Sequence, residues 1–379
     1  MIPHSFQRAL AAKQETKTWR QLSSQQQTLL DFTSNDYLNL SQHPLVIQAA
    51  IEAITVQGTS STGARLLSGN SAAHEALEVD LAHLKNQEAA LIFNTGFQAN
   101  LTILGTILNA QHHNALPIVF SDRLNHASMH QGCQLAGVRQ YRYQHLDYDH
   151  LQHLIKKYAK PGHPHFILTE SIFSMDGDAA DLATLCDLAE SIQAYIYVDE
   201  AHATGVVGQN GCGLTSAYAE RLFAVMGTFS KALGGFGAYV TGSQTLKDFL
   251  INFAPGFIYS TALPPATIAA NHQALKLLPI LSHERQHLEE LSAYARCNLA
   301  RLGFNTGHST THIIPIILDD IEHTQRLYQH LLDHNIRVSC IRPPTVPPHS
   351  SRLRLALQAH HQKDNIDKLC EVLTKQSIA

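Results

Sequence analysis

The chain has 379 residues, of which 44% are hydrophobic and 15% are charged, so it can bury a large core and lacks the composition of a disordered protein. Its length suggests two or three domain-sized units. The net charge of −4, counted with neutral histidines, excludes the basic field expected of a nucleic-acid-binding protein.

The sequence also favours a cytoplasmic protein without a membrane segment. No apolar run approaches the roughly 20 residues needed to span a bilayer, and residues 1–7 lack the charged and apolar regions of a secretory signal. The six cysteines are scattered, which predicts reduced thiols and neither disulfides nor zinc ligands. The 25 histidines include no His-Glu-x-x-His pattern, so we expect no metal site.

Residues 1–40 predict an N-terminal helix and an arm. An amphipathic helix is followed by a polar connection at 23–27, and a short strand then runs into a polar turn within 29–38. A helix is expected from residue 43 to residue 55. The segment 58–70 is rich in Gly, Ser and Thr, so it is too polar for the core and predicts a functional loop.

Residues 41–265 predict a large α/β domain. Short apolar runs alternate with helical segments, which is typical of a mainly parallel sheet covered by helices on both faces. The expected helices cover residues 72–84, 99–108, 148–159 and 182–192. The expected strands cover residues 89–93, 117–120, 166–169, 195–198, 222–226 and 238–240.

Residues 266–379 predict a smaller C-terminal α+β domain, because one long helical stretch is followed by mixed elements. The stretch covers residues 266–300. Strands are then expected at 313–318, 337–341 and 353–357, with helices at 322–334 and at the C-terminus, to about residue 375.

Chemically distinctive residues follow the strands of the large domain. In an open parallel sheet, ligands bind at the carboxyl ends of the strands, so these residues should converge on one edge. Taken alone, Lys231 in its Ser-Lys-x-x-Gly-Gly stretch is better explained as a solvated loop lysine than as a Schiff-base lysine. The residues that follow the other strands are Gly96, His126, Ser174, Asp199 and His202.

Together these residues match the needs of pyridoxal phosphate. The phosphate needs N–H and hydroxyl donors, which a glycine at a helix N-terminus can help supply. The pyridine nitrogen needs a carboxylate, and the aldehyde needs a lysine. A pyridinium would also compensate Asp199, which is costly to bury at a strand end without a cationic partner.

Two other cofactor classes fit less well. Asp199-Glu200-Ala201-His202 also spells a helicase box that would bind Mg²⁺ beside a P-loop, but the chain has no Gly-x-x-x-x-Gly-Lys-[Ser/Thr]. Gly234, Gly235 and Gly237 do not follow the dinucleotide-binding spacing, which argues against a nicotinamide enzyme.

From residue 34 to the C-terminal helix, the chain resembles the α-oxoamine synthases, pyridoxal-phosphate enzymes of the aspartate-aminotransferase-like fold (fold type I). An ordered set of motifs carries the resemblance. They are residues 34–38, 64–70, 94–100, Asn125-His126-Ala127-Ser128, residues 173–178, Val198-Asp199-Glu200-Ala201-His202 and Thr228-Phe229-Ser230-Lys231. The stretch 341–347 resembles the members that join L-alanine to a pimeloyl thioester in biotin synthesis.

The resemblance implies a role for each matching residue around the cofactor. Lys231 would form the Schiff base and move the proton on the substrate's Cα, Asp199 would pair with the pyridine nitrogen, and His126 would stack on the ring. His202 and Ser174 would bind the ring hydroxyl region. Gly96, Phe97 and Thr228 would lie around the cofactor, with Thr228 near the phosphate.

The resemblance also implies substrate contacts and an assembly. Asn35 and Arg354 would bind the amino-acid carboxylate, for which a planar guanidinium is suited. Arg20, Thr345 and His126 would contact the acyl substrate. The site would lie at a homodimer interface, which residues 259–261 would reach from the neighbour.

Three alternatives stay open at this point. One is another α-oxoamine synthase, using glycine with acetyl-CoA or succinyl-CoA, or serine with a long acyl thioester. A second is a catalytically silent scaffold of the same fold. The third concerns the acyl carrier, which could be coenzyme A or acyl-carrier protein.

Overall fold

The computed structural model describes residues 2–16, 18–20, 22 and 29–376, and the chain divides into two compact units. The larger unit comprises Asn35–Ser174 and Asp178–His287. The smaller unit comprises the described parts of Met1–Ser34 and Leu288–Ala379, together with Met175–Gly177. The domain limits expected at residues 40 and 265 stay a prediction. The polar connection expected at 23–27 lies outside the described residues.

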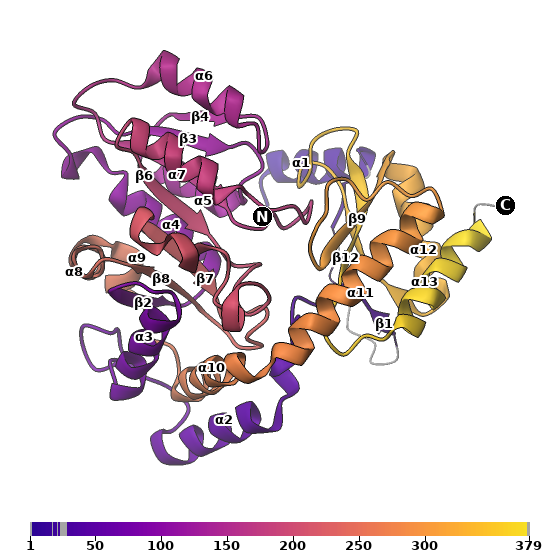
Figure 1. Ribbon diagram of the computed structural model, residues 1–379, viewed down its shortest axis with the longest axis horizontal. Helices are drawn as coiled ribbons and strands as arrows, with labels where there is room; N and C mark the ends of the chain where they lie inside the picture. The colour runs from indigo at the N-terminus through magenta and orange to yellow at the C-terminus, as the bar shows by residue number, and fades with distance from the viewer. Residues whose placement is uncertain (1, 17, 21, 23–28, 377–379) are drawn as a thin grey trace. The chain divides into compact units, whose positions relative to one another are not determined.

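A seven-stranded sheet forms the centre of the larger unit, in the order β2-β8-β7-β6-β5-β3-β4 (Figure 1). All neighbouring pairs are parallel except those made by β8, which is antiparallel to both β2 and β7. The strands are β2 (Ala89–Phe93), β3 (Ile118–Asp122), β4 (Gln140–Tyr143), β5 (His165–Glu170), β6 (Tyr195–Asp199), β7 (Ala224–Thr228) and β8 (Ala238–Gly242).

Two hydrophobic clusters contain residues of this sheet. Each cluster also contains residues of its own set of helices. One contains residues of α4 (Gly96–Ile107), α5 (Ala127–Leu135), α8 (Gln244–Phe253) and α9 (Pro255–Ile258). The other contains residues of α6 (Tyr148–Tyr158) and α7 (Leu182–Ser191). Burial on both faces explains why the central strands are continuously apolar.

The remaining helices of the larger unit are α2 (Pro44–Gln57), α3 (Ala72–Leu84) and α10 (Pro265–Leu277). The long helix expected over 266–300 is interrupted. After α10 comes a short 3-10 segment, Leu278–Ile280, and α11 then runs over Ser282–Arg301. Pro279 lies in that segment and lacks the N–H that a continuous helix needs, which accounts for the break.

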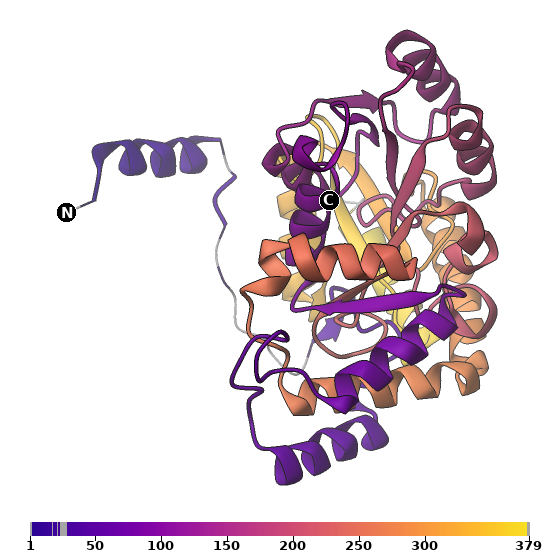
Figure 2. The same ribbon diagram turned by 90° about the vertical axis from the view of Figure 1, so that its left-hand side faces the viewer.

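The smaller unit is built on the antiparallel sheet β11-β12-β9 and on a parallel pair, β1 with β10. None of the residues of its first helix, α1, is buried, and Figure 2 shows α1 beside the N-terminus. No described helix has the length and apolarity needed to cross a bilayer. The elements are α1 (His4–Glu15), β1 (Leu30–Asp31), β9 (Ile313–Asp319), α12 (Ile321–Asp333), β10 (Ile336–Arg337), β11 (Ser339–Ile341), β12 (Ser351–Ala356) and α13 (Lys363–Gln376).

Candidate active site

The carboxyl ends of five strands of the large sheet share one edge. Pairing places Glu170 of β5 beside Asp199 of β6, and Asp199 beside Met226 of β7. At the other side of β7, Thr228 and Phe93 both pair with Ala238 of β8. The side chains that follow β2, β3, β5, β6 and β7 therefore begin from a common edge, as the sequence predicts.

Asp199 is a buried carboxylate held by neutral donors. The side-chain amide of Asn100 donates to its Oδ2 at 2.8 Å, and the backbone N–H of Ala201 donates to its Oδ1 at 3.0 Å. Asn100, from α4, is itself oriented by the hydroxyl of Tyr197, which donates to the amide oxygen at 2.7 Å. Because neither donor carries a charge, the site favours a cationic ligand beside Asp199.

The turn after β6 is fixed by a buried ion pair. Lys85 Nζ lies 2.7 Å from Glu200 Oε2, and both side chains are fully buried. Glu200 also accepts hydrogen bonds from the backbone N–H groups of Leu214 and Thr215. This turn carries His202, whose Nδ1 lies 2.6 Å from the hydroxyl of Tyr37. Asp199 and His202 are thus held on a rigid segment.

His126 caps the N-terminus of α5 at the same edge. Its Nδ1 accepts the backbone N–H of Ser128 and lies 2.7 Å from the Ser128 hydroxyl, and its own backbone N–H donates to Glu170 Oε1 at 2.6 Å. The rings of His126 and Phe97 meet edge to face, with centroids 6.3 Å apart. Both side chains are exposed on the edge of the sheet.

The charges of Lys231 and Asp199 both act on His126. Desolvation by the surrounding protein lowers the pKa of His126, the Asp199 carboxylate opposes this, and the Lys231 ammonium adds to it. Burial raises the pKa of Glu170 well above its usual value, and Asp199 adds to that effect. These groups therefore share one electrostatic environment.

Lys231 is half-buried in a tight loop three residues after β7. This strand runs from Ala224 to Thr228, two residues later than expected. The loop is closed by hydrogen bonds from Gly234 N–H to the Lys231 carbonyl and from Gly235 N–H to the Phe229 carbonyl, both 2.8 Å. Gly234 has φ +62°, and a Cβ there would lie 2.1 Å from the backbone nitrogen of Ser41. Only glycine fits this turn.

Thr228, at the end of β7, lies close to Gly96, at the start of α4. The Thr228 hydroxyl is buried without a hydrogen-bond partner among the described residues. A Cβ on Gly96 would lie 2.7 Å from Thr228 Cγ2, so a larger residue at position 96 would crowd this side chain. The N-terminus of α4, capped by the Thr95 hydroxyl, begins at this glycine. An unpaired hydroxyl beside a helix N-terminus suits an anion such as a phosphate.

The predicted site residues are divided between the two units. Asn35 and Ser174 belong to the larger unit, and Asn35 Oδ1 accepts the hydroxyl of Tyr37 at 3.1 Å. Arg20, Thr345 and Arg354 belong to the smaller unit. There, Arg20 Nη2 donates to the Thr345 hydroxyl at 3.0 Å, beside a cavity of about 900 Å³ that also includes Arg337 and Arg342 in its lining.

Sequence reasoning missed the residues that support the predicted ones. Asn100, Tyr37 and Glu170 contact Asp199, His202 and His126, respectively. Asn100 did leave a signal, because asparagine is a poor helix former and here it interrupts the apolar sequence of α4. Nothing in the local pattern indicated which group it would contact.

The chain matches the aminotransferase class I and II family over residues 27–373. It is 47% identical over 348 residues to 8-amino-7-oxononanoate synthase of Gluconacetobacter diazotrophicus, covering 91% of this chain and 87% of the relative. The 8-amino-7-oxononanoate synthase structure from Francisella tularensis has a TM-score of 0.80 at 28% identity, covering 93% of this chain and 99% of the other.

A structure described as SPT with PLP as an internal aldimine has a TM-score of 0.91 at 25% identity, covering 99% and 98% of the two chains. These similarities confirm the fold class expected from the sequence.

Proposed function

Because this chain belongs to the aminotransferase class I and II family, and within it to the pyridoxal-phosphate-dependent transferases of the α-oxoamine synthase type, we propose that it is an 8-amino-7-oxononanoate synthase. It would condense L-alanine with a pimeloyl thioester, releasing CO₂ and the free thiol, in cytoplasmic biotin synthesis. The observation that carries the proposal is the buried Asp199 carboxylate, which accepts hydrogen bonds from the Asn100 amide and the Ala201 backbone N–H and shares its electrostatic environment with Lys231 and His126.

The residues present fit pyridoxal phosphate. Asp199 offers a buried carboxylate to a cationic ring nitrogen, and the unpaired Thr228 hydroxyl offers a donor to the phosphate. Gly96 leaves room beside that hydroxyl. His126 and Phe97 expose ring faces at the same edge, and His202 and Ser174 would bind the ring hydroxyl region. When bound, the cofactor supplies an electron sink for the bond broken at Cα of the amino acid.

Lys231 would hold the cofactor and then move the alanine proton. Its amine can attack a carbonyl only when it is neutral. In the reaction, the Lys231 amine would remove the proton from the alanine Cα and later return one to the product.

Five residues are proposed to bind the substrates. Asn35 and Arg354 would bind the alanine carboxylate, and His126, Arg20 and Thr345 would contact the acyl chain. In the balanced reaction, a carbon–carbon bond forms between alanine Cα and the acyl carbon. The carbon–sulfur bond breaks to release the thiol, and the bond to the alanine carboxylate breaks to release CO₂.

We propose a homodimer, in which residues 259–261 reach the neighbour's site. Exposed apolar side chains support it, because apolar surface left exposed by one copy can be covered by another. Helix α2 exposes Leu45, Ile51 and Val56, and Tyr259 is 83% exposed. A second copy of the chain would cover such side chains.

A panel of substrates tests the proposed function. Purified enzyme loaded with pyridoxal phosphate is incubated with L-alanine, glycine or L-serine, each with pimeloyl-, acetyl-, succinyl- or palmitoyl-CoA, and with pimeloyl-acyl-carrier protein. We expect the mass of 8-amino-7-oxononanoate from alanine with a pimeloyl thioester, faster than any other product. Faster turnover of glycine or serine with another thioester would instead assign a different synthase of the family, and no binding of pyridoxal phosphate would favour a silent scaffold.

A further inference from the structure

We infer that His145, held as a cation between Asp122 and Asp178, is a positioning residue that fixes the turn carrying Ser174 at the cofactor edge of the sheet. The inference rests on the proposed contact of Ser174 with the cofactor. None of His145, Asp122 and Asp178 has a role in the chemistry described above.

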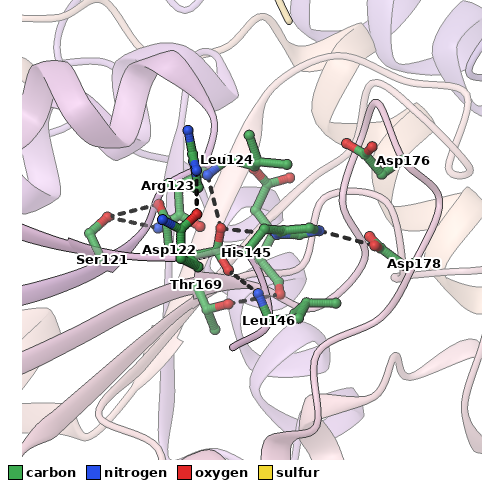
Figure 3. Close-up of polar contacts among 12 residues, drawn as sticks. Ser121, Asp122, Arg123, Leu124, His145, Leu146, Thr169, Asp176 and Asp178 are labelled. Carbon is green, nitrogen blue, oxygen red and sulfur yellow. Dashed lines mark hydrogen bonds and ion pairs between the residues drawn. The ribbon is translucent and has the colours of Figure 1, made fainter. Parts of the chain in front are cut away.

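Both ring nitrogens of His145 lie at hydrogen-bond distance from a carboxyl oxygen. Nδ1 lies 3.0 Å from Asp122 Oδ1, and Nε2 lies 3.0 Å from Asp178 Oδ2 (Figure 3). A neutral imidazole has only one N–H, whereas an imidazolium has two. An imidazolium at this position can donate to both carboxyl groups, through two charge-assisted hydrogen bonds.

Asp122 makes one side of this bridge rigid. It ends β3 and is fully buried, and it accepts the backbone N–H groups of Leu124 and Leu146, each at 2.9 Å. Leu146, the residue after His145, has φ +52°, a conformation that leucine rarely adopts. Such a backbone persists only where its surroundings hold it in place, so the sheet edge determines where His145 lies.

Asp178 forms the other side, at the base of a turn. Its carbonyl accepts the backbone N–H of Phe173 at 3.0 Å, and an isolated bridge pairs Ile172 with Ala179. Ser174 follows Phe173 directly, at the start of the turn. The ring of His145 also meets the ring of Phe173 edge to face, with centroids 4.4 Å apart. His145 therefore contacts both stems of the turn.

The Asp178 side chain depends on His145. Its Oδ2 is bonded to His145, and its Oδ1 is buried without a hydrogen-bond partner among the described residues. Removing the imidazolium would leave a buried carboxylate without its cation, which is strongly unfavourable. The turn would then have to open or shift, and Ser174 would shift with it.

The groups that face the bridge support the charged imidazole. Burial alone lowers the pKa of His145, but the hydrogen bonds and charges of Asp122 and Asp178 outweigh it and raise that pKa to about 10. Burial raises the pKa of Tyr148 of α6 to about 12, and the charges of Asp181, Asp122 and Asp178 add to that effect, so it stays neutral. The guanidinium of Arg123, after β3, is bonded to the Gln144 side chain.

The first test asks whether His145 is a cation. The full-length holoenzyme is labelled with ¹⁵N-histidine, and the signal lost in His145→Gln is assigned to His145. We expect both ring nitrogens to stay protonated from pH 6 to pH 9. Titration of this signal near pH 6.5, the value of an unperturbed histidine, would overturn the inference.

The second test asks whether His145 positions Ser174. His145→Gln and Ser174→Ala should each weaken pyridoxal phosphate binding by roughly 10–100-fold, measured by absorbance titration of the apoenzyme. The double variant should bind the cofactor with nearly the same affinity as the single variant that binds it more weakly. His130→Gln is the matched control, because His130 bonds Gln140 and neither carboxylate, so it should bind like the wild type. Adding Asp178→Asn to His145→Gln should restore part of the lost binding and thermal stability.

The possible results distinguish a failure of the positioning role of His145 from a failure of the proposed function. If the wild type binds the cofactor and His145→Gln binds it equally well, the positioning role is wrong while the proposed function stands. Fully additive losses in the double variant would show that His145 does not act through Ser174, and would also overturn the inference. If the wild type itself binds no pyridoxal phosphate, the proposed function fails, and the NMR result still decides the charge on His145.

Discussion

The side-chain amide of Asn100 lies 2.8 Å from the buried carboxylate of Asp199 and holds it in place. The two residues are 99 positions apart in the chain, on α4 and at the end of β6. The bond fixes the orientation of the Asp199 side chain.

Replacing Asn100 with leucine should weaken cofactor binding. The variant keeps the number and branching of the side-chain heavy atoms but removes the donor to Asp199 and the acceptor of Tyr197. We expect roughly 10–100-fold weaker pyridoxal phosphate binding, with a lower melting temperature, measured by absorbance titration and calorimetry. Asn252→Leu, at an exposed position of α8, is the control. Unchanged binding in Asn100→Leu would mean that Asp199 needs no such support.

Thr228→Val should weaken cofactor binding without lowering the stability of the protein. The Thr228 hydroxyl is buried and unpaired, and removing an unsatisfied polar group costs no hydrogen bond, so the melting temperature of the apoenzyme should stay the same or rise. Pyridoxal phosphate should bind about 10–100-fold more weakly, because a hydrogen bond to a charged group contributes about 1.5–3 kcal/mol. Wild-type affinity in this variant would remove Thr228 from the phosphate site.

Lys231→Ala should abolish turnover while leaving the fold intact. The lysine is half-buried, and loss of its acid–base role alone should lower the rate by about 10²–10⁴-fold. The visible absorbance of the lysine-bound cofactor should also disappear. Lys276→Ala, at an exposed position of α10, should behave like the wild type. Near-normal turnover in Lys231→Ala would contradict the assigned role.

The protein should lose stability in mild acid. Burial lowers the pKa of His74 and His361 to about 4, and that of His312 to about 3. In the unfolded chain these groups titrate near 6.5. Between about pH 6.5 and pH 4 the unfolded state therefore binds more protons, so the free energy of unfolding falls as the pH falls. The melting temperature should drop over that window, and it should drop less in His361→Gln than in the wild type.

Much of the architecture could be predicted from the sequence, because buried strands are continuously apolar. The strand expected at 89–93 is β2 itself, and those at 166–169 and 195–198 lie within β5 and β6. Strand β4 was missed, since Gln140–Tyr143 is polar and only its last residue is buried, as suits a strand at the sheet's edge. The reversed direction of β8 was also missed, because strand direction leaves no local mark in the sequence.

Candidate site residues could be predicted where they follow strands. Contacts between segments that are distant in the sequence could not be predicted. Asp199 and Lys231 were predicted as site residues from their places at the end of β6 and after β7. The bond between Tyr37 and His202 joins residues 165 positions apart, and the bridge through His145 joins two aspartates from separate turns. Single residues in loops carry no periodic signal, so only the folded chain reveals such partners.

Carboxyl-¹³C-labelled L-alanine gives the most direct test of the proposed reaction. The enzyme is incubated with this substrate and a pimeloyl thioester, and labelled CO₂, free thiol and product mass are followed together. We predict one labelled CO₂ for each thiol released, and unlabelled 8-amino-7-oxononanoate as the product. Label retained in the product, or thiol released without CO₂, would contradict decarboxylative condensation.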